Sequence, residues 1–196
     1  MFTGIVQATG GVREVHPRDR GARVVIGAGS LDLSDVKMGD SIAVNGCCLT
    51  VVELLPGAFA VDLSRETLEH TTGFAAGTAV NLEKAMRLSD RLGGHLVSGH
   101  VDGRGEVTRW EPEGESWLLE VRIPAELSKY LARKGSITLD GVSLTLNRVE
   151  RDRFEVNLIP HTLEVTNLKG LRRGAWVNVE VDLLARYLER LMSGKD

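Results

Sequence analysis

An internal repeat constrains the fold of this chain more than any other feature of its sequence. Similar segments recur at one constant offset of 95 residues: Ser41–Thr50 with Ser136–Thr145, Phe59–Thr71 with Phe154–Thr166, and Phe2–Val12 with Val97–Val107. A last pair, Gly77–Glu83 and Gly174–Glu180, is offset by about two residues more. A period this long indicates two tandem domains rather than a solenoid of small units. Two related domains favour two related ligands, or one ligand bound twice.

The composition narrows the class of protein. The 196 residues accommodate two domains of about 95 residues each, and a hydrophobic content of 42% is enough for two cores. A net charge of −3 disfavours duplex nucleic acid as a partner, because phosphate binding needs clustered Lys and Arg. No apolar run is long enough for a transmembrane helix, and the opening MFTGIVQATGG lacks the pattern of a signal peptide. The adjacent Cys47 and Cys48 do not form a disulfide framework, so we expect a cytoplasmic protein.

Alternating apolar residues, separated by Gly- or Asp-rich breaks, are typical of antiparallel β-barrels and indicate an all-β fold. In the first copy we expect strands near Gly4–Ala8, Arg23–Ile26, Ser41–Val44, Leu49–Leu54, Phe59–Leu63 and Ala79–Glu83. In the second copy we expect strands near Gly99–Gly103, Glu106–Arg109, Trp117–Ile123, Ile137–Leu139, Leu144–Glu150, Phe154–Leu158 and Trp176–Val181. Residues 1–94 and 95–182 are expected to form the two barrels, joined near Gly93-Gly94.

The C-terminal segment, residues 183–196, has no counterpart in the first copy. Its apolar residues recur at helical spacing: Leu183, Leu184, Tyr187, Leu188, Leu191 and Met192. Asp182 is suited to begin this helix as its N-cap, and Gly194 to end it. The helix either packs on its own barrel or joins neighbouring subunits. Shorter helical turns are expected at RETLEH after Ser64, at HTLEVT after Pro160, and from Pro124 onward.

Chemistry is expected where the two copies differ. Cys48 occupies the position that Ser143 occupies in the second copy, and Leu-Thr follows both. A thiol supplies some thiolate at neutral pH, whereas a serine needs a base to become nucleophilic. We therefore expect the two sites to have different chemical roles. A small residue that merely fits after a glycine turn is the simpler alternative.

Two histidines, His95 and His100, lie close together in sequence at the start of the second copy. No third ligand at metal spacing accompanies them, which disfavours a metal. Either histidine is suited to proton transfer or hydrogen bonding, and a surface position near the linker is the alternative. The chain has no glycine-rich phosphate loop, GxSxG elbow, HExxH or CxxC motif, so we expect a mechanism without a cofactor.

Over nearly its whole length the chain resembles the riboflavin synthases. The resemblance is carried by a set of motifs: MFTGIV at the N-terminus, NGCCLTV at Asn45–Val51, GGHLVSGHVDG at Gly93–Gly103, KGSITLDGVSLTLN at Lys134–Asn147, and LIPHTLEVTNL at Leu158–Leu168. It implies two six-stranded Greek-key barrels and a C-terminal helix that holds a homotrimer. It also implies that two molecules of 6,7-dimethyl-8-ribityllumazine react, one giving a four-carbon unit to the other, without cofactor or metal.

The resemblance implies a site between the N-terminal barrel of one subunit and the C-terminal barrel of a neighbour. The first pocket would be lined by Gly4, Ile5, Val6, Cys48, Leu49, Thr50, Asp62, Leu63, Ser64, Arg65, Glu66 and Thr67. The second would be lined by Gly99, His100, Val101, Lys134, Ser143, Leu144, Thr145, Asn157, Leu158, Ile159, Pro160, His161 and Thr162. In some relatives a lumazine synthase capsid encloses the trimer, and the sequence leaves that partner open.

Within this resemblance we expect Cys48 to act as a transient nucleophile, and Ser143 and Thr145 to position substrate or move protons. His100 with Asp182 would give polar support near the second pocket. The closest alternative is a lumazine-carrying antenna protein of the same double-barrel form, which does not catalyse the reaction. The intact GGHLVSGHVDG and GVSLTLN motifs in the second half favour the enzyme.

Overall fold

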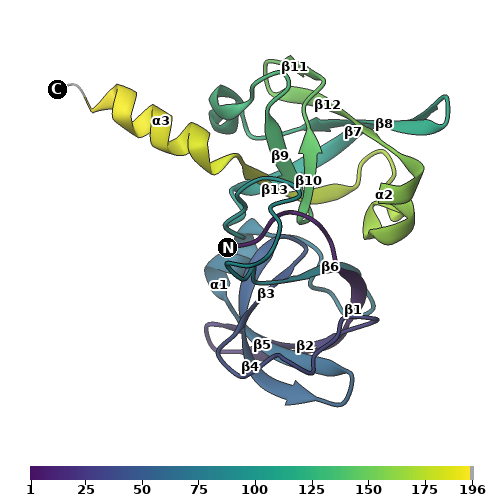
Figure 1. The fold of residues 1–196 in the computed structure, drawn as a ribbon, viewed down its shortest axis with the longest axis vertical. Coiled ribbons are helices and arrows are strands. Elements are labelled where there is room, and N and C mark those ends of the chain that lie inside the picture. The colour runs from purple at the N-terminus through teal and green to yellow at the C-terminus, as the bar shows by residue number, and fades with distance from the viewer. Residues whose placement is uncertain (195–196) are drawn as a thin grey trace.

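Six strands of the first repeat close into a barrel in the computed structural model, which describes residues 1–194 (Figure 1). They are β1 (Ala8–Arg18), β2 (Gly21–Gly27), β3 (Ser41–Val44), β4 (Cys47–Leu55), β5 (Ala58–Ser64) and β6 (Ala79–Lys84). The order around the barrel is β1-β2-β5-β4-β3-β6, with antiparallel pairing throughout. Because β3 pairs with β6 rather than with β2, the connection is the expected Greek key. Inward residues such as Val24, Ile26 and Phe59 are fully buried in its core.

The second repeat builds the same arrangement. Its strands are β7 (Gly103–Glu113), β8 (Ser116–Arg122), β9 (Ser136–Leu139), β10 (Val142–Thr145), β11 (Arg148–Glu150), β12 (Arg153–Leu158) and β13 (Trp176–Val181). The order β10-β9-β13-β7-β8-β12-β11 repeats that of the first barrel, with β10 and β11 in the place of β4. The single strand expected over Leu144–Glu150 is therefore wrong, since it is broken at Leu146 and Asn147. Leu146 turns fully into the core there, while the Asn147 N–H still bonds the Glu155 carbonyl at 2.8 Å.

Two further strand predictions are wrong. The segments Gly4–Ala8 and Gly99–Gly103 largely precede β1 and β7, which begin at Ala8 and Gly103. Gly4 has φ +75° and Gly99 has φ +79°, a backbone conformation outside the strand region. Alternating apolar residues predicted a strand in both places, but the chain turns there toward the other barrel.

A network of side-chain amides joins the barrels. The Asn81 side-chain amide donates to the Asp140 carbonyl at 2.9 Å, and Asn178 donates to the Asn45 carbonyl at 2.9 Å. These contacts are equivalent under the repeat, so the two barrels meet in an approximately twofold arrangement. All four residues are at least 95% buried. Buried amides need their hydrogen bonds, so this junction holds the barrels in one relative orientation.

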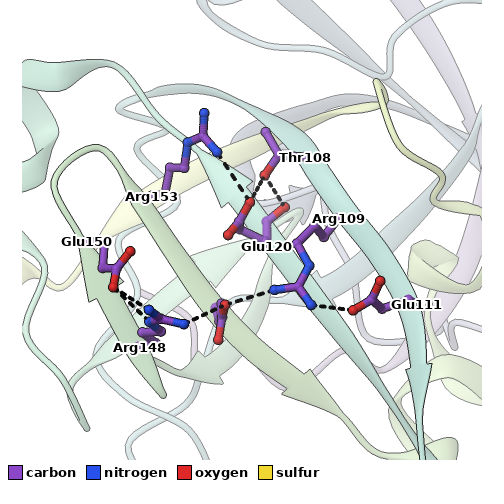
Figure 2. Close-up of polar contacts among 8 residues, drawn as sticks. Thr108, Arg109, Glu111, Glu120, Arg148, Glu150 and Arg153 are labelled. Carbon is purple, nitrogen blue, oxygen red and sulfur yellow. Dashed lines mark hydrogen bonds and ion pairs between the residues drawn. The ribbon is translucent and has the colours of Figure 1, made fainter.

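The outer face of the second barrel carries a ladder of ion pairs, which Figure 2 shows. Glu155 lies between Arg109, at 3.2 Å, and Arg148, at 3.8 Å. On the same face, the Arg153 guanidinium lies 3.7 Å from the Glu120 carboxylate. The arginines are about half exposed, so solvent screens these pairs and they contribute little to stability.

Short helices connect the strands: α1 (Arg65–His70), α2 (Pro160–Val165), and the 3₁₀ turns η1 (Ala125–Tyr130) and η2 (Asn167–Gly170). The helical turns expected after Ser64, after Pro160 and after Pro124 are thus confirmed. Ser64 caps α1 by accepting the Thr67 N–H at 3.1 Å. Both α1 and α2 lie at equivalent places, beside the ends of β5 and β12.

The C-terminal helix α3 (Leu183–Ser193) projects away from both barrels (Figure 1). As expected, the Asp182 carboxylate caps it by accepting the Leu184 N–H at 3.0 Å, and Gly194 follows its last turn. Arg186 pairs with Asp102, and Glu189 contacts Lys129 and Tyr130 of η1, so polar contacts link the helix to the second barrel. The apolar stripe does not lie on its own barrel: Leu184, Tyr187, Leu188, Leu191 and Met192 are between 59% and 77% exposed.

Candidate functional site

Two short segments cross between the barrels, and they shape both predicted pockets. We call Phe2–Val6 the N-terminal strap and Val97–Val101 the linker strap. They pair through two hydrogen bonds between Phe2 and Val97, of 2.7 and 3.1 Å. Phe2 is fully buried there within the single chain. Val6 packs on the core of the second barrel, and Val101 packs on the core of the first.

A buried glutamate holds each strap. Glu83, at the end of β6, accepts the N–H groups of Thr3 and Gly4 at 2.6 and 3.0 Å, and the Thr3 hydroxyl at 2.8 Å. Glu180, at the end of β13, accepts the N–H groups of Ser98 and Gly99 at 2.6 and 2.9 Å, and the Ser98 hydroxyl at 2.7 Å. Burial raises the pKa of both carboxyls, while these hydrogen bonds act in the opposite direction.

The linker strap closes a cavity beside Cys48. The Cys48 N–H donates to the Gly99 carbonyl at 2.7 Å. A Cβ on Gly99 would lie 2.6 Å from the Cys48 Cβ, so only glycine fits this approach. The cavity measures about 430 Å³, and α1 forms its other wall. Its lining residues are Cys47, Cys48, Glu66, Thr67, His70, Thr71, Gly99, His100, Val101 and Asp102.

The two neighbouring cysteines differ in access. Cys47 is buried on the inner face of β4, and burial raises its pKa to about 12. Its thiol is therefore protonated and unreactive at neutral pH. Cys48 is partly exposed and lies at the cavity. Both cysteines line the cavity, and Cys48 is the more exposed of the two.

The N-terminal strap makes the equivalent approach to Ser143. The Ser143 N–H donates to the Gly4 carbonyl at 2.8 Å, and a Cβ on Gly4 would lie 2.6 Å from the Ser143 Cβ. Here the hydroxyl already has a partner, because His95 Nδ1 lies 2.7 Å from Ser143 Oγ. The other ring nitrogen, Nε2, lies 3.3 Å from the Thr138 hydroxyl. These contacts fix the orientation of the imidazole beside Ser143.

Electrostatics favour the neutral form of His95. Burial lowers its pKa, and the negative charge of Asp182 acts in the opposite direction. A neutral imidazole hydrogen-bonded to a hydroxyl is the arrangement of a base and the group it activates. A ring nitrogen of His95 is therefore in contact with the Ser143 hydroxyl, and the equivalent position in the first barrel carries the thiol of Cys48.

The structure divides the strap residues between the pockets differently from the prediction. Gly99, His100 and Val101 lie with Cys48, not with Ser143. Gly4 lies with Ser143, and Ile5 and Val6 follow it along the strap. The reason is the crossing: each strap leads into its own barrel but lies across the opposite one. His100 is consequently near Asp102 at the Cys48 cavity, while Asp182 caps α3 and acts on His95.

Several predicted ligand residues have other partners. Asp62 forms a two-bond ion pair with Arg23, at 2.8 and 3.0 Å, on the outer face of the barrel, and this hydrogen bonding lowers the pKa of Asp62. Its equivalent, Asn157, donates to Glu113 and to Ser116, each at 2.9 Å. The Lys134 ammonium lies 3.2 Å from the Asn147 side chain.

Other predicted residues are positioned by the strands. Leu49, Leu63 and Leu158 are buried in the barrel cores. The remaining predicted residues lie on exposed or partly exposed surface: Thr50, Ser64, Arg65, Leu144, Thr145, Ile159, Pro160, His161 and Thr162. None of the first-pocket members among them lines the Cys48 cavity.

Residues that the sequence did not single out also belong to this region. They are Thr138 at the Ser143 side, whose partner His95 carried an ambiguous signal, and Cys47, His70, Thr71 and Asp102 at the cavity. At the offset of 95 residues, His95 has no counterpart in the first copy, so a comparison of the two copies gives no information about its role. Among residues 1–194, no group of three or more His, Cys, Asp or Glu is arranged to hold a metal ion. Within the same residues, every helix is too short or too polar to cross a bilayer.

Comparison with known proteins agrees with this architecture. The family model of the lumazine binding domain matches the chain twice, over residues 3–85 and 98–182. The riboflavin synthase of Photobacterium leiognathi is 47% identical over 194 residues, covering 98% of this chain and 89% of that protein. The riboflavin synthase of Bacillus subtilis is 41% identical over 194 residues, covering 98% and 90%.

Solved structures show the same fold. A crystal structure of LumP in complex with riboflavin superposes with a TM-score of 0.85 at 29% identity, covering 92% of this chain and 99% of that one. A crystal structure of LumP with 6,7-dimethyl-8-(1'-D-ribityl)lumazine gives a TM-score of 0.83 at 28% identity, over the same shares of the two chains.

Proposed function

Because this chain belongs to the riboflavin synthase family, we propose that it converts two molecules of 6,7-dimethyl-8-ribityllumazine into riboflavin and 5-amino-6-(ribitylamino)pyrimidinedione. One lumazine gives a four-carbon unit to the other. Atoms balance between the two substrates and the two products, so the net reaction needs no water, oxidant or reductant. The enzyme must therefore supply position and proton transfer, and proximity of two bound rings is itself a large part of the acceleration.

The observation that carries this proposal is the pair of equivalent, strap-covered surfaces that differ in chemistry. The cavity at Cys48, of about 430 Å³, is within the usual size range of a small-molecule site. The surface at Ser143 has His95 in hydrogen-bond contact. We propose that one lumazine binds at each, and that backbone groups of the straps bond the pyrimidine edge. The crystal structure of LumP with a ribityl lumazine supports this ligand class.

Proton removal is assigned to the Ser143 side. The methyl group at C7 of a lumazine is acidic, because the carbanion delocalises into the ring. His95 is neutral at neutral pH and is suited to accept this proton, directly or through the Ser143 hydroxyl. Cys48 would add to the ring of the other lumazine as a transient nucleophile. Thr145 is proposed to position substrate or move protons, as predicted from the sequence. His100 is proposed to give polar support, now at the Cys48 cavity.

The two reacting surfaces are proposed to meet between subunits of a homotrimer. The exposed apolar stripe of α3 supports this assembly, since a stripe of this kind is stabilised by burial against partner chains. We propose residues 1–94 and 95–182 as the two lumazine-binding domains and 183–196 as the assembly segment, of which 195–196 lie outside the described residues. Enclosure by a lumazine synthase capsid stays a prediction.

The test is to incubate the purified protein with the lumazine alone and follow flavin fluorescence. We expect one riboflavin for every two lumazines consumed, with the pyrimidinedione in equal amount. A protein that binds the lumazine tightly but forms no riboflavin would be a carrier of the LumP kind, and the proposed reaction would be wrong.

A further inference from the structure

We propose that Glu83 and Glu180 are positioning residues that act crosswise: Glu83 of the first barrel shapes the Ser143 surface of the second, and Glu180 of the second barrel shapes the Cys48 cavity of the first. This inference rests on the proposed function only in what the two surfaces bind. The crosswise geometry itself is independent of the ligand.

The path from Glu180 to the cavity is short. Its carboxylate accepts the Ser98 and Gly99 N–H groups, and the carbonyl of the same Gly99 accepts the Cys48 N–H. The next residues of the strap, His100 and Val101, line the cavity wall. Removing the carboxylate releases Gly99 on one side, so it also loosens the bond at Cys48 on the other.

The path from Glu83 leads to the other surface. Its carboxylate accepts the Thr3 and Gly4 N–H groups, and the carbonyl of the same Gly4 accepts the Ser143 N–H. The Thr3 carbonyl also accepts the His95 N–H at 3.1 Å. Both the serine and its histidine partner are thus tied to a strap that Glu83 holds, although Glu83 lies on the first barrel.

The chemistry explains why a carboxylate is needed. Each strap directs three donors, two N–H groups and one hydroxyl, at a single side chain that is at least 96% buried. A carboxylate only accepts, and it has two oxygens for these donors. A glutamine of the same size would point its NH₂ group at one of the backbone N–H groups. That NH₂ group and that N–H group are both donors, so neither would have an acceptor. The substitution therefore keeps the volume and breaks the contact.

The test compares Glu83→Gln and Glu180→Gln, which serve as matched controls for each other. Backbone amide exchange is measured by peptide-resolved hydrogen–deuterium exchange in the unliganded full-length protein. In Glu180→Gln we expect the segment with the Cys48 amide to exchange about tenfold faster while the segment with Ser143 stays within twofold. In Glu83→Gln we expect the reverse pattern. The crosswise assignment would be overturned if amide protection were lost only in the barrel that carries the substitution. It would also be overturned if exchange changed equally at both segments.

Ligand binding gives a second measure, with riboflavin as a probe that the reaction does not consume. Protection of the Cys48 thiol from iodoacetamide reports occupancy of the cavity. We expect Glu180→Gln to lose at least tenfold in riboflavin affinity by this measure, and Glu83→Gln to keep wild-type protection. If the wild-type protein forms no riboflavin from the lumazine while the exchange pattern is crosswise, the proposed function fails and this inference stands. If riboflavin binds but both variants lose protection equally, this inference fails and the function stands.

Milder variants keep the test decisive if either glutamine variant does not fold. Thr3→Val and Ser98→Ala each remove one hydroxyl donor from the same two carboxylates. We expect the same crosswise pattern of amide exchange with a smaller amplitude, about threefold. Faster exchange near Ser143 in Ser98→Ala, without a change near Cys48, would contradict the proposal.

Discussion

The two barrels share one plan, but their reactive surfaces are prepared in opposite ways. Beside Cys48 the linker strap borders a cavity that His70 and His100 also line. Beside Ser143 a histidine is already in contact with the hydroxyl. The frame that holds each strap, a glutamate with three donors, is the same in both barrels. The two barrels thus share the glutamate and its three donors, and they differ in the side chain beneath the strap, a thiol in one and a hydroxyl in the other.

We expect the largest effect on turnover from His95, which contacts Ser143 and has no counterpart in the first repeat. His95→Gln keeps a polar group beside Ser143 but cannot accept a proton, so we expect turnover to fall by roughly 100-fold. The wild-type rate should fall with decreasing pH as His95 becomes protonated, with a midpoint below its ordinary pKa of 6.5, because burial lowers that pKa. Steady-state kinetics against pH measures both. The control is His16→Gln on β1, whose ring bonds Glu14 at an exposed position, and an equal loss there would refute the assignment.

The cysteine in the first barrel is expected to have a smaller but measurable role. Cys48→Ser gives the first surface a hydroxyl without the contact that His95 makes with Ser143. We expect turnover to fall about tenfold, because a hydroxyl without a base is a weak nucleophile. Riboflavin affinity should stay within about threefold, since the side chain keeps its size. Wild-type turnover in Cys48→Ser would remove the nucleophile from the mechanism and leave Cys48 as a small residue that fits beneath Gly99.

A buried acid distinguishes the barrels in stability rather than activity. Asp140 stands where the first repeat has Asn45, and burial raises its pKa from 3.8 to about 7, while the bond from the Asn178 N–H acts in the opposite direction. The folded protein therefore keeps a proton that the unfolded chain has lost. Its free energy of unfolding should fall as pH rises from about 4 to about 7, and then level off.

Asp140→Asn copies the first barrel at this position. We expect the variant to lose this part of the pH dependence and to be more stable than the wild type above pH 7. Urea denaturation at a series of pH values measures the difference between the two proteins, which cancels the titration of all other groups. A difference that does not change between pH 4 and pH 8 would show that Asp140 is ionised in the folded state.

The smallest effect is expected on the outer face of the second barrel. Glu155→Gln removes the negative charge that Arg109 and Arg148 share in the ladder of Figure 2. Because the arginines are solvent-exposed, we expect only a small loss of stability, and the loss should diminish with added salt. Thermal unfolding at low and high salt measures it. A larger, salt-independent loss would mean that the ladder is part of the barrel's packing.

The sequence predicted the elements well where periodicity alone decides them. The strands expected at Ser41–Val44 and Trp176–Val181 have those bounds in the structure, and α3 begins and ends as its cap residues indicate. Asp182 was identified as the cap, because a carboxylate before an apolar helical stripe has one obvious local partner. Local chemistry of this kind is visible in a single sequence.

The exchange of the straps could not be predicted from the repeat. An offset of 95 residues relates Gly4 to Gly99 and Cys48 to Ser143 equally well whether each strap covers its own barrel or the opposite one. Only the three-dimensional arrangement distinguishes the two cases. The same limit hid the pairing of His95 with Ser143, since the two residues are 48 positions apart and one of them has no repeat partner.

The crossed straps also constrain how such a gene could have arisen. Cutting this chain between its halves would leave each barrel without the segment that covers its reactive residue, because that segment travels with the other half. A protein with a single copy would meet the same requirement if two molecules exchanged their N-terminal segments, so that each segment covered the other molecule. In this chain the exchange takes place between covalently linked halves, so the sequence of each half can differ from that of the other.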